Sequence, residues 1–226
     1  MSKIKVTYID HMGDDLSVVN AARVSFGKKS EFVDGEIKED EAGPYMEMVL
    51  SNKDKKLIRY LAKHKHLSPF GHAFASFHVK APIFVARQLV KHKFLRWNEI
   101  SRRYVDEEPE FYVPDVWRGR SADKKQGSEG VVDTAITSEY IATLAKGVYN
   151  NLLEEGVAPE QARMVLPQNA MTEWYWSGSL DAFAAMCKLR CASDTQYESR
   201  IVANQIREHM AELFPVSWEA LMENIE

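Results

Sequence analysis

The chain has 226 residues, of which 45% are hydrophobic and 27% are charged, and this composition is typical of a globular protein. Its 29 basic and 33 acidic residues give a net charge of −4, which argues against a generally basic nucleic-acid coat protein but not against a local basic site. The two cysteines, Cys187 and Cys191, are too few for a secreted disulfide scaffold, and no apolar run approaches the roughly 20 residues of a membrane span. Because residues 1–10 also lack the basic and apolar regions of a signal peptide, we expect a soluble cytoplasmic protein.

The first half of the chain combines two predicted strands with three predicted helices. Alternation of polar and apolar residues predicts strands at 3–9 and 74–79, the second with its even-numbered residues on one face and its odd-numbered residues on the other. Capping residues and apolar spacing predict helices over 16–26, capped by Asp14 or Asp15, about 52–65, capped by Ser51 or Asn52, and 82–94. The charged segment 27–44 holds three glycines and indicates a loop, and residues 97–110 form a polar segment.

The second half is mainly helical by the same criteria. Residues 111–113 and the aromatic segment 171–176 are predicted to be extended, and the composition of 119–130 indicates a mobile loop. Helices are predicted over 131–155, 158–166, 179–190 (capped by Ser179), 196–214 and 218–225. Few strands, mostly early, together with many helices favour an α+β fold, and we expect one domain over residues 1–226.

Positive charge is concentrated in residues 87–103, which hold six Lys or Arg and one Glu. Their local charge is +5, so the rest of the chain sums to −9. Arg87 and Lys91 lie one turn apart on one face of the predicted helix. Lys93 would point elsewhere on a regular helix. Lys91 and Lys93 could still converge on a site if the helix ends there, or if they serve ligands from different subunits. A solvated amphipathic helix would show the same charges. The amide, carboxylate, hydroxyl, guanidinium and phenol groups between Asn98 and Tyr104 favour a nucleotide site instead.

Within this region Lys91-His92-Lys93 is followed by seven residues and then Ser101, Arg102, Arg103 and Tyr104. The pattern resembles the signature of the flavin-dependent thymidylate synthases, which is Arg-His-Arg, any seven residues, Ser. The resemblance extends over nearly the whole chain and includes residues 21–25, 66–72, 162–167 and 189–198. It implies an α+β fold with a small antiparallel sheet and several helices.

The resemblance also implies roles for individual residues. Those that match flavin contacts of the family are His66, Ser68, Lys91, His92, Lys93, Glu99 and Ser179. Those that match dUMP contacts are Gln88, Lys91, Glu99, Ser101, Arg103, Arg163 and Arg190. Among them Arg103 matches the phosphate partner, Arg163 an arginine that another subunit supplies, and Arg190 the catalytic arginine that polarises the uracil ring and promotes ionisation at its N3.

The implied reaction is reductive methylation of dUMP at C5 to give dTMP. The family uses bound FAD, takes the carbon from 5,10-methylenetetrahydrofolate and the reducing equivalents from NADPH, and works as a homotetramer with sites at subunit interfaces. The protein would supply orientation and electrostatics, while the cofactor carries the hydride chemistry. No phosphate-binding glycine loop is present, so NADPH would bind transiently at the flavin site.

The sequence departs from the family pattern in two respects. Lysines stand at 91 and 93 in place of arginines, so the charge is kept but the planar bidentate fork is lost. Positions where some relatives carry asparagines for the flavin are Ser179 and Ala185 here, and only the serine can form a hydrogen bond.

Several residue clusters also allow other interpretations. Four histidines at 64, 66, 72 and 78 lack a recognised metal-ligand spacing, so we expect no metal site. Residues 174–176 are more typical of a core or a subunit interface than of a stacking site. Cys187 and Cys191 are more typical of buried apolar positions than of a nucleophile, although Arg190 between them would activate either.

Two alternative functions remain open at this stage. The first is a related flavin enzyme that modifies C5 of another pyrimidine nucleotide, or transfers a hydroxymethyl group. The second is an inactive relative that binds a nucleotide or a nucleic acid through residues 87–103, with strongly salt-dependent affinity. We expect dUMP and further copies of the chain as partners, no membrane, and no nucleic acid.

Overall fold

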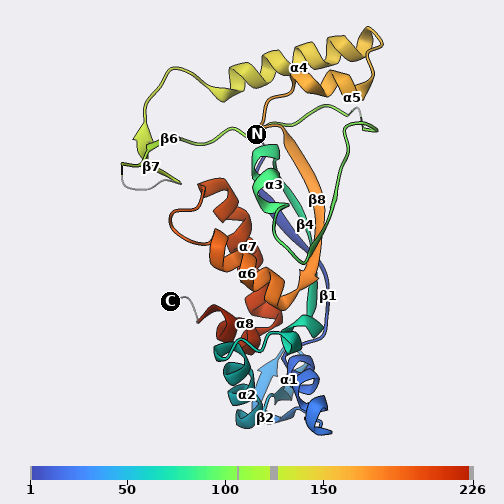
Figure 1. The fold of residues 1–226 in the computed structure, drawn as a ribbon, viewed down its shortest axis with the longest axis vertical. Helices are drawn as coiled ribbons and strands as arrows, with labels where there is room; N and C mark the ends of the chain where they lie inside the picture. The colour runs from blue at the N-terminus through green and yellow to red at the C-terminus, as the bar shows by residue number, and fades with distance from the viewer. Residues whose placement is uncertain (1, 106, 123–126, 224–226) are drawn as a thin grey trace.

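A four-stranded antiparallel sheet forms the centre of the protein, as seen in the computed structural model, which describes residues 2–105, 107–122 and 127–223 (Figure 1). The strand order is β1-β4-β8-β5. The strands are β1 (Lys5–Met12), β4 (Phe74–Pro82), β8 (Met171–Ser179) and β5 (Leu95–Glu99). Helices α3 (Ile83–Leu89), α6 (Leu180–Arg190) and α7 (Tyr197–Leu213) pack beside the sheet (Figure 1). The predicted α+β class with a small antiparallel sheet is confirmed.

The alternating pattern of β4 decides which face of the sheet is buried. Phe77 and Val79 point into the core and lie opposite Trp176 and Trp174 of β8 in the strand register. Phe77 also meets Phe183 of α6 edge to face, with ring centroids 5.2 Å apart. The even-numbered residues of β4 from 74 to 80 are less buried, which is usual for an antiparallel sheet covered on one side. The predicted faces, the extended segment 171–176 and the core position of both tryptophans are thus confirmed.

Most predicted helices also appear, and their caps explain where they begin. Helix α1 (Asp15–Arg23) starts with a capping box formed by Asp14 and Ser17, and α2 (Asn52–Lys63) starts where the Ser51 side chain accepts a hydrogen bond from the backbone of Asp54. The remaining helical elements are η1 (Val24–Phe26), η2 (Ser68–His72), α4 (Ser138–Glu154), α5 (Pro159–Ala162), η3 (Arg163–Val165) and α8 (Pro215–Met222). Figure 1 places α4 and α5 at the opposite end of the molecule from α1 and α2.

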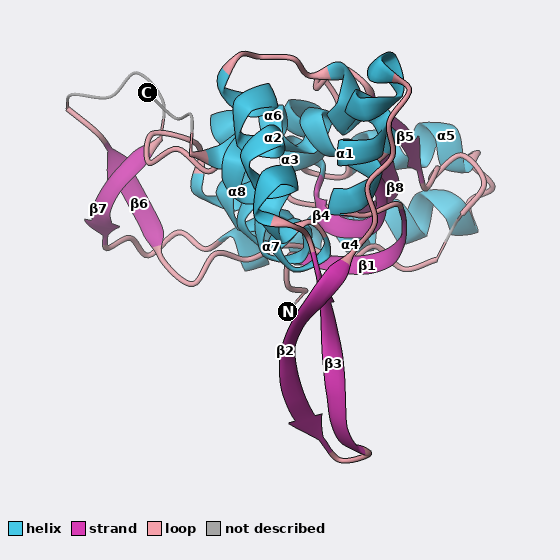
Figure 2. Cartoon of the chain, turned by 90° about the horizontal axis from the view of Figure 1, so that it is seen from below, coloured by secondary structure: helices cyan, strands magenta, loops and turns pink. Residues whose placement is uncertain are grey.

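Both segments predicted as loops are hairpins instead. Residues 27–44 contribute to β2 (Val33–Asp40), which pairs with β3 (Gly43–Val49) in an arm that projects from the body (Figure 2). Residues 119–130 overlap β6 (Trp117–Arg120) and β7 (Ser128–Val132), and residues 123–126 of that prediction lie outside the described residues. Charge and glycine indicated loops, but a two-stranded ribbon exposed to solvent tolerates charged side chains, and Gly43 supplies the positive φ of the turn.

Several element boundaries were also predicted wrongly. Helix α3 ends at Leu89 instead of 94, and the polar segment after it contributes strand β5, because pairing with β8 outweighs the weak local signal. Helix α4 begins at Ser138 instead of 131, since residues 131–132 belong to β7, and α8 begins at Pro215, which suits a first helical position. Ser179 stands at the start of α6, but its side chain makes no capping hydrogen bond.

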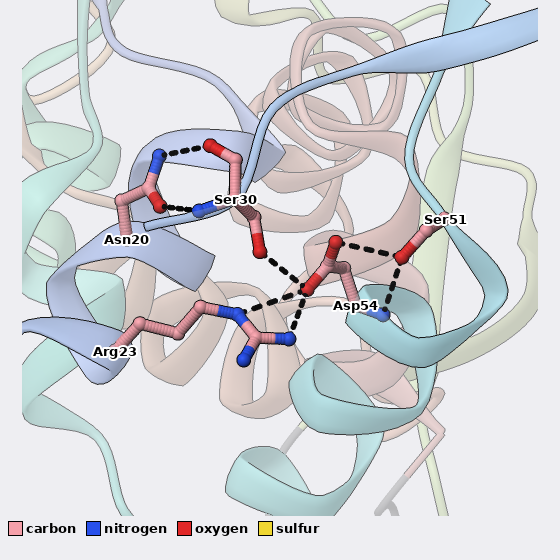
Figure 3. Close-up of polar contacts among 5 residues, drawn as sticks. All are labelled: Asn20, Arg23, Ser30, Ser51 and Asp54. Carbon is pink, nitrogen blue, oxygen red and sulfur yellow. Dashed lines mark hydrogen bonds and ion pairs between the residues drawn. The ribbon is translucent and has the colours of Figure 1, made fainter. Parts of the chain in front are cut away.

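A buried polar cluster holds both ends of the β2–β3 arm against α1 and α2 (Figure 3). Asp54 of α2 accepts hydrogen bonds from Arg23 Nη2 at 2.5 Å, from the Ser30 hydroxyl at 2.9 Å and from the Ser51 hydroxyl at 2.7 Å. Asn20 completes the cluster by pairing with the backbone N–H and C=O of Ser30. Ser30 precedes β2 and Ser51 follows β3, so one carboxylate anchors the arm at its entry and its exit.

No helix within the described residues is long and apolar enough to cross a membrane. In the same part of the chain no group of three His, Cys, Asp or Glu side chains is arranged to hold a metal ion. Cys187 is buried and donates to the Ala203 carbonyl at 3.5 Å, and its burial raises the pKa of the thiol well above the ordinary value. This agrees with the interpretation of Cys187 as a buried structural residue.

Candidate active site

A cavity of about 680 Å³ lies between α3, α6, the first turn of α7 and the segment from Tyr112 to Arg118. Its volume falls within the roughly 300–1,000 Å³ of typical small-molecule sites. Three residues of the predicted set line it together: Gln88 from α3, Lys91 just after α3, and Arg190 from the last turn of α6. The structure therefore brings the beginning of the signature region next to the predicted catalytic arginine.

The amide group of Gln88 is held in place by α7. Ser199 donates its hydroxyl to Gln88 Oε1 at 3.1 Å, and Gln88 Nε2 donates to the side-chain oxygen of Gln196. Both the carbonyl and the amino group of the Gln88 amide thus have fixed partners, which orients this side chain at the cavity wall. Gln196 lines the cavity too; it belongs to the family pattern, but the sequence assigned it no role.

Arg190 and His92 form the closest contact between two predicted site residues. Arg190 Nε donates a hydrogen bond to His92 Nε2 at 3.0 Å. Burial and the neighbouring Arg190 charge together lower the pKa of His92 from 6.5 to about 4. The ring is therefore neutral at physiological pH, with Nε2 as acceptor and its proton on Nδ1. This contact holds the Arg190 guanidinium in one orientation at the cavity wall.

The depressed pKa of His92 predicts a pH dependence of stability. Because the folded-state pKa lies below the unfolded value, the stabilising contribution is complete above about pH 6.5 and is lost as pH falls toward 4. We expect a loss of about 1–2 kcal/mol, smaller than the full shift would give, because His92 is partly exposed to screening solvent. Urea unfolding at several pH values measures it, and His92→Gln should flatten this part of the profile. A His92 that titrates near 6.5 by NMR would contradict the prediction.

A second polar group in the cavity wall joins β6 to α7. Glu198 of α7 is only 4% exposed and forms an ion pair with Arg118 of β6. The Tyr112 hydroxyl lies 3.5 Å from Glu198 Oε1, and the Arg118 guanidinium lies 4.5 Å from the centre of the Tyr197 ring. Burial, followed by the Glu198 charge, raises the pKa of Tyr112 to about 12. The sequence offered no signal for Arg118 or Tyr112, because neither belongs to a recognisable local motif.

The other residues of the signature region lie outside the cavity lining. Glu99, at the end of β5, accepts hydrogen bonds from Trp97 Nε1 at 3.1 Å and from the Thr172 hydroxyl at 2.6 Å. The Ser101 hydroxyl accepts from the backbone N–H and from Nε of Arg103, each at 3.3 Å. Lys93 and Arg103 are exposed. These groups form an open surface next to β5.

Four further predicted residues are distributed over three other parts of the chain. His66 and Ser68 are exposed in the turn after α2 and at the start of η2. Arg163 is exposed in η3, where its Nε donates to the Glu160 carbonyl at 3.2 Å. Ser179 is buried at the start of α6. None of the four lines the cavity, so the described part of one chain does not assemble the full predicted set.

Comparison with known proteins decides the family. The model of the thymidylate synthase complementing protein family matches residues 7–216. Flavin-dependent thymidylate synthase of Thermus thermophilus is 42% identical over 97% of this chain and 76% of its own length. The chain belongs to the flavin-dependent thymidylate synthase family. The enzyme of Kosmotoga olearia is 38% identical over 96% of this chain and 89% of its own length.

Solved structures agree with membership of the flavin-dependent thymidylate synthase family. The UMP/dUMP methylase PolB of Streptomyces cacaoi, solved with 5-bromo-dUMP, superposes with a TM-score of 0.82 at 32% identity. The alignment covers 98% of this chain and 96% of that chain. The predicted family and its fold are thereby confirmed, and with them the prediction that the chain is an enzyme of the thymidylate synthase type.

The lysine variant of the flavin-dependent thymidylate synthase signature leaves its two cations exposed. Lys91 and Lys93 both reach solvent, and no ion pair found in the described part of the chain involves either of them. Lys91 faces the cavity, while His92 between them points toward Arg190. Two uncompensated ammonium groups beside a neutral imidazole make a surface suited to an anionic ligand.

Proposed function

We propose that this enzyme converts dUMP to dTMP by reductive methylation at C5, with FAD as cofactor, 5,10-methylenetetrahydrofolate as carbon donor and NADPH as reductant. The observation that carries the proposal is the convergence of Gln88, Lys91 and Arg190 on one cavity in a member of this family. The similarity to a UMP/dUMP methylase that binds 5-bromo-dUMP supports a pyrimidine nucleotide as substrate.

Arg190 is the residue that we assign to uracil activation. Burial lowers the pKa of Arg190, but the ordinary pKa of an arginine is so far above neutrality that the guanidinium stays charged. The hydrogen bond to neutral His92 fixes the guanidinium, so its remaining N–H donors are oriented before substrate arrives. Donors fixed in this way stabilise negative charge that develops on a uracil ring when N3 loses its proton. Ser199 and Gln196 fix the Gln88 amide, and its second N–H and second oxygen lone pair would bind the same nucleotide.

The donor set around the signature fits a flavin. Lys91 and Lys93 are unpaired cations, and His92 keeps a proton on Nδ1 while Nε2 accepts from Arg190. The ring heteroatoms and the diphosphate of FAD are mainly hydrogen-bond acceptors, so donors and positive charge are the groups required. FAD, when bound and reduced by NADPH, would supply the hydride that reduces the transferred carbon. The lysines act as point charges and cannot make the bidentate contacts of arginine, which predicts weaker binding of the flavin ring.

We propose that the complete site forms between subunits of a homotetramer. The exposed positions of His66, Ser68, Arg103 and Arg163 away from the cavity support this arrangement. Helix α4 also carries an exposed apolar stripe, whose residues follow one another at intervals of one turn: Tyr140, Leu144 and Val148. In this proposal residues 1–226 act as one domain, and the flavin and nucleotide roles of Ser101, Glu99 and Ser179 are those that the family pattern implies.

The test is a complete assay on the purified protein. We expect the protein to become yellow with added FAD and to form dTMP from dUMP only when methylenetetrahydrofolate and NADPH are both present. A folded protein that takes up no flavin, or that turns over without the folate, would contradict the proposal. Analytical ultracentrifugation of the same sample measures whether four chains associate.

UMP is the second candidate substrate. PolB is described as a UMP/dUMP methylase, and its structure with 5-bromo-UMP superposes on this chain with a TM-score of 0.79 at 31% identity. Release of tritium from C5 of labelled dUMP and UMP, measured side by side, distinguishes the two. We expect dUMP to be preferred, and a higher kcat/KM for UMP would reverse this assignment.

A further inference from the structure

Two non-glycine residues among those described have positive φ, and each adjoins a predicted flavin residue. They are Lys65, with φ 57°, which precedes His66, and Phe94, with φ 65°, which follows Lys93. Residues with a Cβ rarely adopt this left-handed conformation, and for a bulky residue it marks either strain or function.

The conformation of Lys65 has a local explanation. Lys65 N bonds to the Ala62 carbonyl at 3.1 Å and His66 N bonds to the Leu61 carbonyl at 2.9 Å. These are the two hydrogen bonds of a Schellman motif, in which the residue after the helix C-cap takes a left-handed conformation. The end of α2 therefore accounts for Lys65.

Phe94 has no such explanation, because α3 ends at Leu89 and the next regular element is β5. Its turn is instead held tightly against β8. A Cβ atom on Gly178 would lie 3.0 Å from the Phe94 carbonyl oxygen and 2.4 Å from a Leu95 side-chain carbon. The neighbouring strand thus has a glycine where the Phe94 backbone comes close, and this packing keeps the strained turn in place.

The Phe94 ring has little contact with its own chain. The residue is 83% exposed, the largest exposure among the large hydrophobic residues of the described chain. Glycine would remove both the backbone strain and the exposed apolar surface at this position. The phenyl ring therefore lowers the stability of the isolated chain without a compensating contact inside it, which indicates that the ring contacts a partner outside the chain.

We propose that Phe94 is a stacking platform for the planar heteroaromatic ring of the flavin held by Lys91 and Lys93. This inference rests on the proposed function. The position fits because Lys93 and Phe94 are consecutive and both exposed, while His92 turns inward to Arg190. Two cations and an exposed aromatic ring within four residues match a ligand that has both phosphate groups and a flat ring. Stacking also compensates for the bidentate contacts that the lysines cannot make.

The test separates loss of the ring from loss of apolar bulk. Phe94→Leu keeps the bulk, and we expect it to weaken FAD binding by about ten-fold or more, since stacking on an aromatic side chain has that magnitude. Phe94→Tyr should bind within about two-fold of the wild type, as expected if the ring is what matters. Fluorescence quenching of FAD, titrated with each apoprotein, gives the dissociation constants. Tyr45→Leu, which removes a partly exposed ring from the β2–β3 arm, is the matched control and should leave them unchanged.

A second variant gives a signature that a purely structural residue would not show. Phe94→Gly relieves the left-handed strain, so we expect the apoprotein to melt a few degrees higher while FAD binds at least ten-fold more weakly. Failure of the wild type to bind FAD would overturn the proposed function itself. Normal FAD binding by the wild type together with unchanged binding by Phe94→Leu would overturn only the role of Phe94. A change of association state in Phe94→Leu with FAD affinity retained would assign the ring to a subunit contact instead.

Discussion

Replacing Arg190 with alanine is expected to lower kcat by about 10²–10³-fold, the usual cost of removing one fixed donor from a site of developing charge. The guanidinium lines the cavity and is oriented by His92 at 3.0 Å, so its loss removes charge stabilisation that solvent does not replace. Single-turnover formation of dTMP measures the effect free of product release. The pKa of His92 should also rise from about 4 in this variant, because the adjacent positive charge has gone, and NMR titration detects this independently of turnover.

Two controls define the interpretation of this experiment. Arg190→Lys keeps a charge but not the planar donor set, so we expect it to recover only part of the rate. Arg59→Ala removes an exposed arginine whose partner is Glu219 on the surface, and it should leave kcat unchanged. An unchanged kcat in Arg190→Ala would show that the uracil ring is activated by another group.

Asp54→Ala is expected to destabilise the fold by about 3–5 kcal/mol, the usual consequence of removing one partner of a buried ion pair. Asp54 is 3% exposed, and its loss would leave Arg23 charged and Ser30 and Ser51 without their acceptor (Figure 3). Burial alone would raise the pKa of Asp54, but hydrogen bonds from Arg23, Ser51 and Ser30 outweigh it and hold the pKa below its ordinary value. This contribution is therefore present at neutral pH and is lost only when pH falls through that lowered pKa.

Urea unfolding measures the free energy that Asp54→Ala costs, provided that the m-value is the same as in the wild type. Glu47→Ala is the matched control, because it breaks the exposed Lys38–Glu47 ion pair of the same arm, and it should cost less than about 1 kcal/mol. Replacing Arg23 and Asp54 together with apolar residues should recover much of the loss, since no charge is then buried alone. Faster amide exchange across residues 33–49 in Asp54→Ala would confirm that this carboxylate anchors the arm. If Asp54→Ala and Glu47→Ala were equally stable, the cluster around Asp54 would have no role in stability.

The sequence predicted those elements whose signal is local. Asp14 and Ser51 were recognised as possible helix caps because a side chain three residues from its backbone partner is a short-range feature. The alternation in 74–79 predicted the two faces of β4, and the odd-numbered face is the buried one because that strand is covered on one side only. The hairpins β2–β3 and β6–β7 were missed because their strands carry charge on exposed ribbons, where no hydrophobic pattern is needed.

Strand β5 shows the limit of local patterns more clearly. Its five residues pair with β8, about 80 positions later in the chain, and the Trp97 ring stacks on Trp174 with centroids 4.3 Å apart. Helix α3 ends before this strand, and the left-handed turn at Phe94 lies between the two elements. Such a choice depends on a distant partner strand, so the composition of residues 97–110 alone could not indicate it.

By itself, the sequence determined the family, the fold class, the cationic signature at Lys91 and Lys93, and the identity of Arg190 as the catalytic candidate. Only the tertiary structure decided which of these groups meet. The Arg190–His92 contact spans 98 positions, the Gln88–Ser199 bond 111, and the Arg118–Glu198 pair 80. The first two contacts form because α3, α6 and α7 pack beside one sheet, and the third joins β6 to α7. Together they bring separate segments to a single cavity. Hydrogen bonds and charges act over a few ångströms in space, and spacing along the chain does not encode that distance.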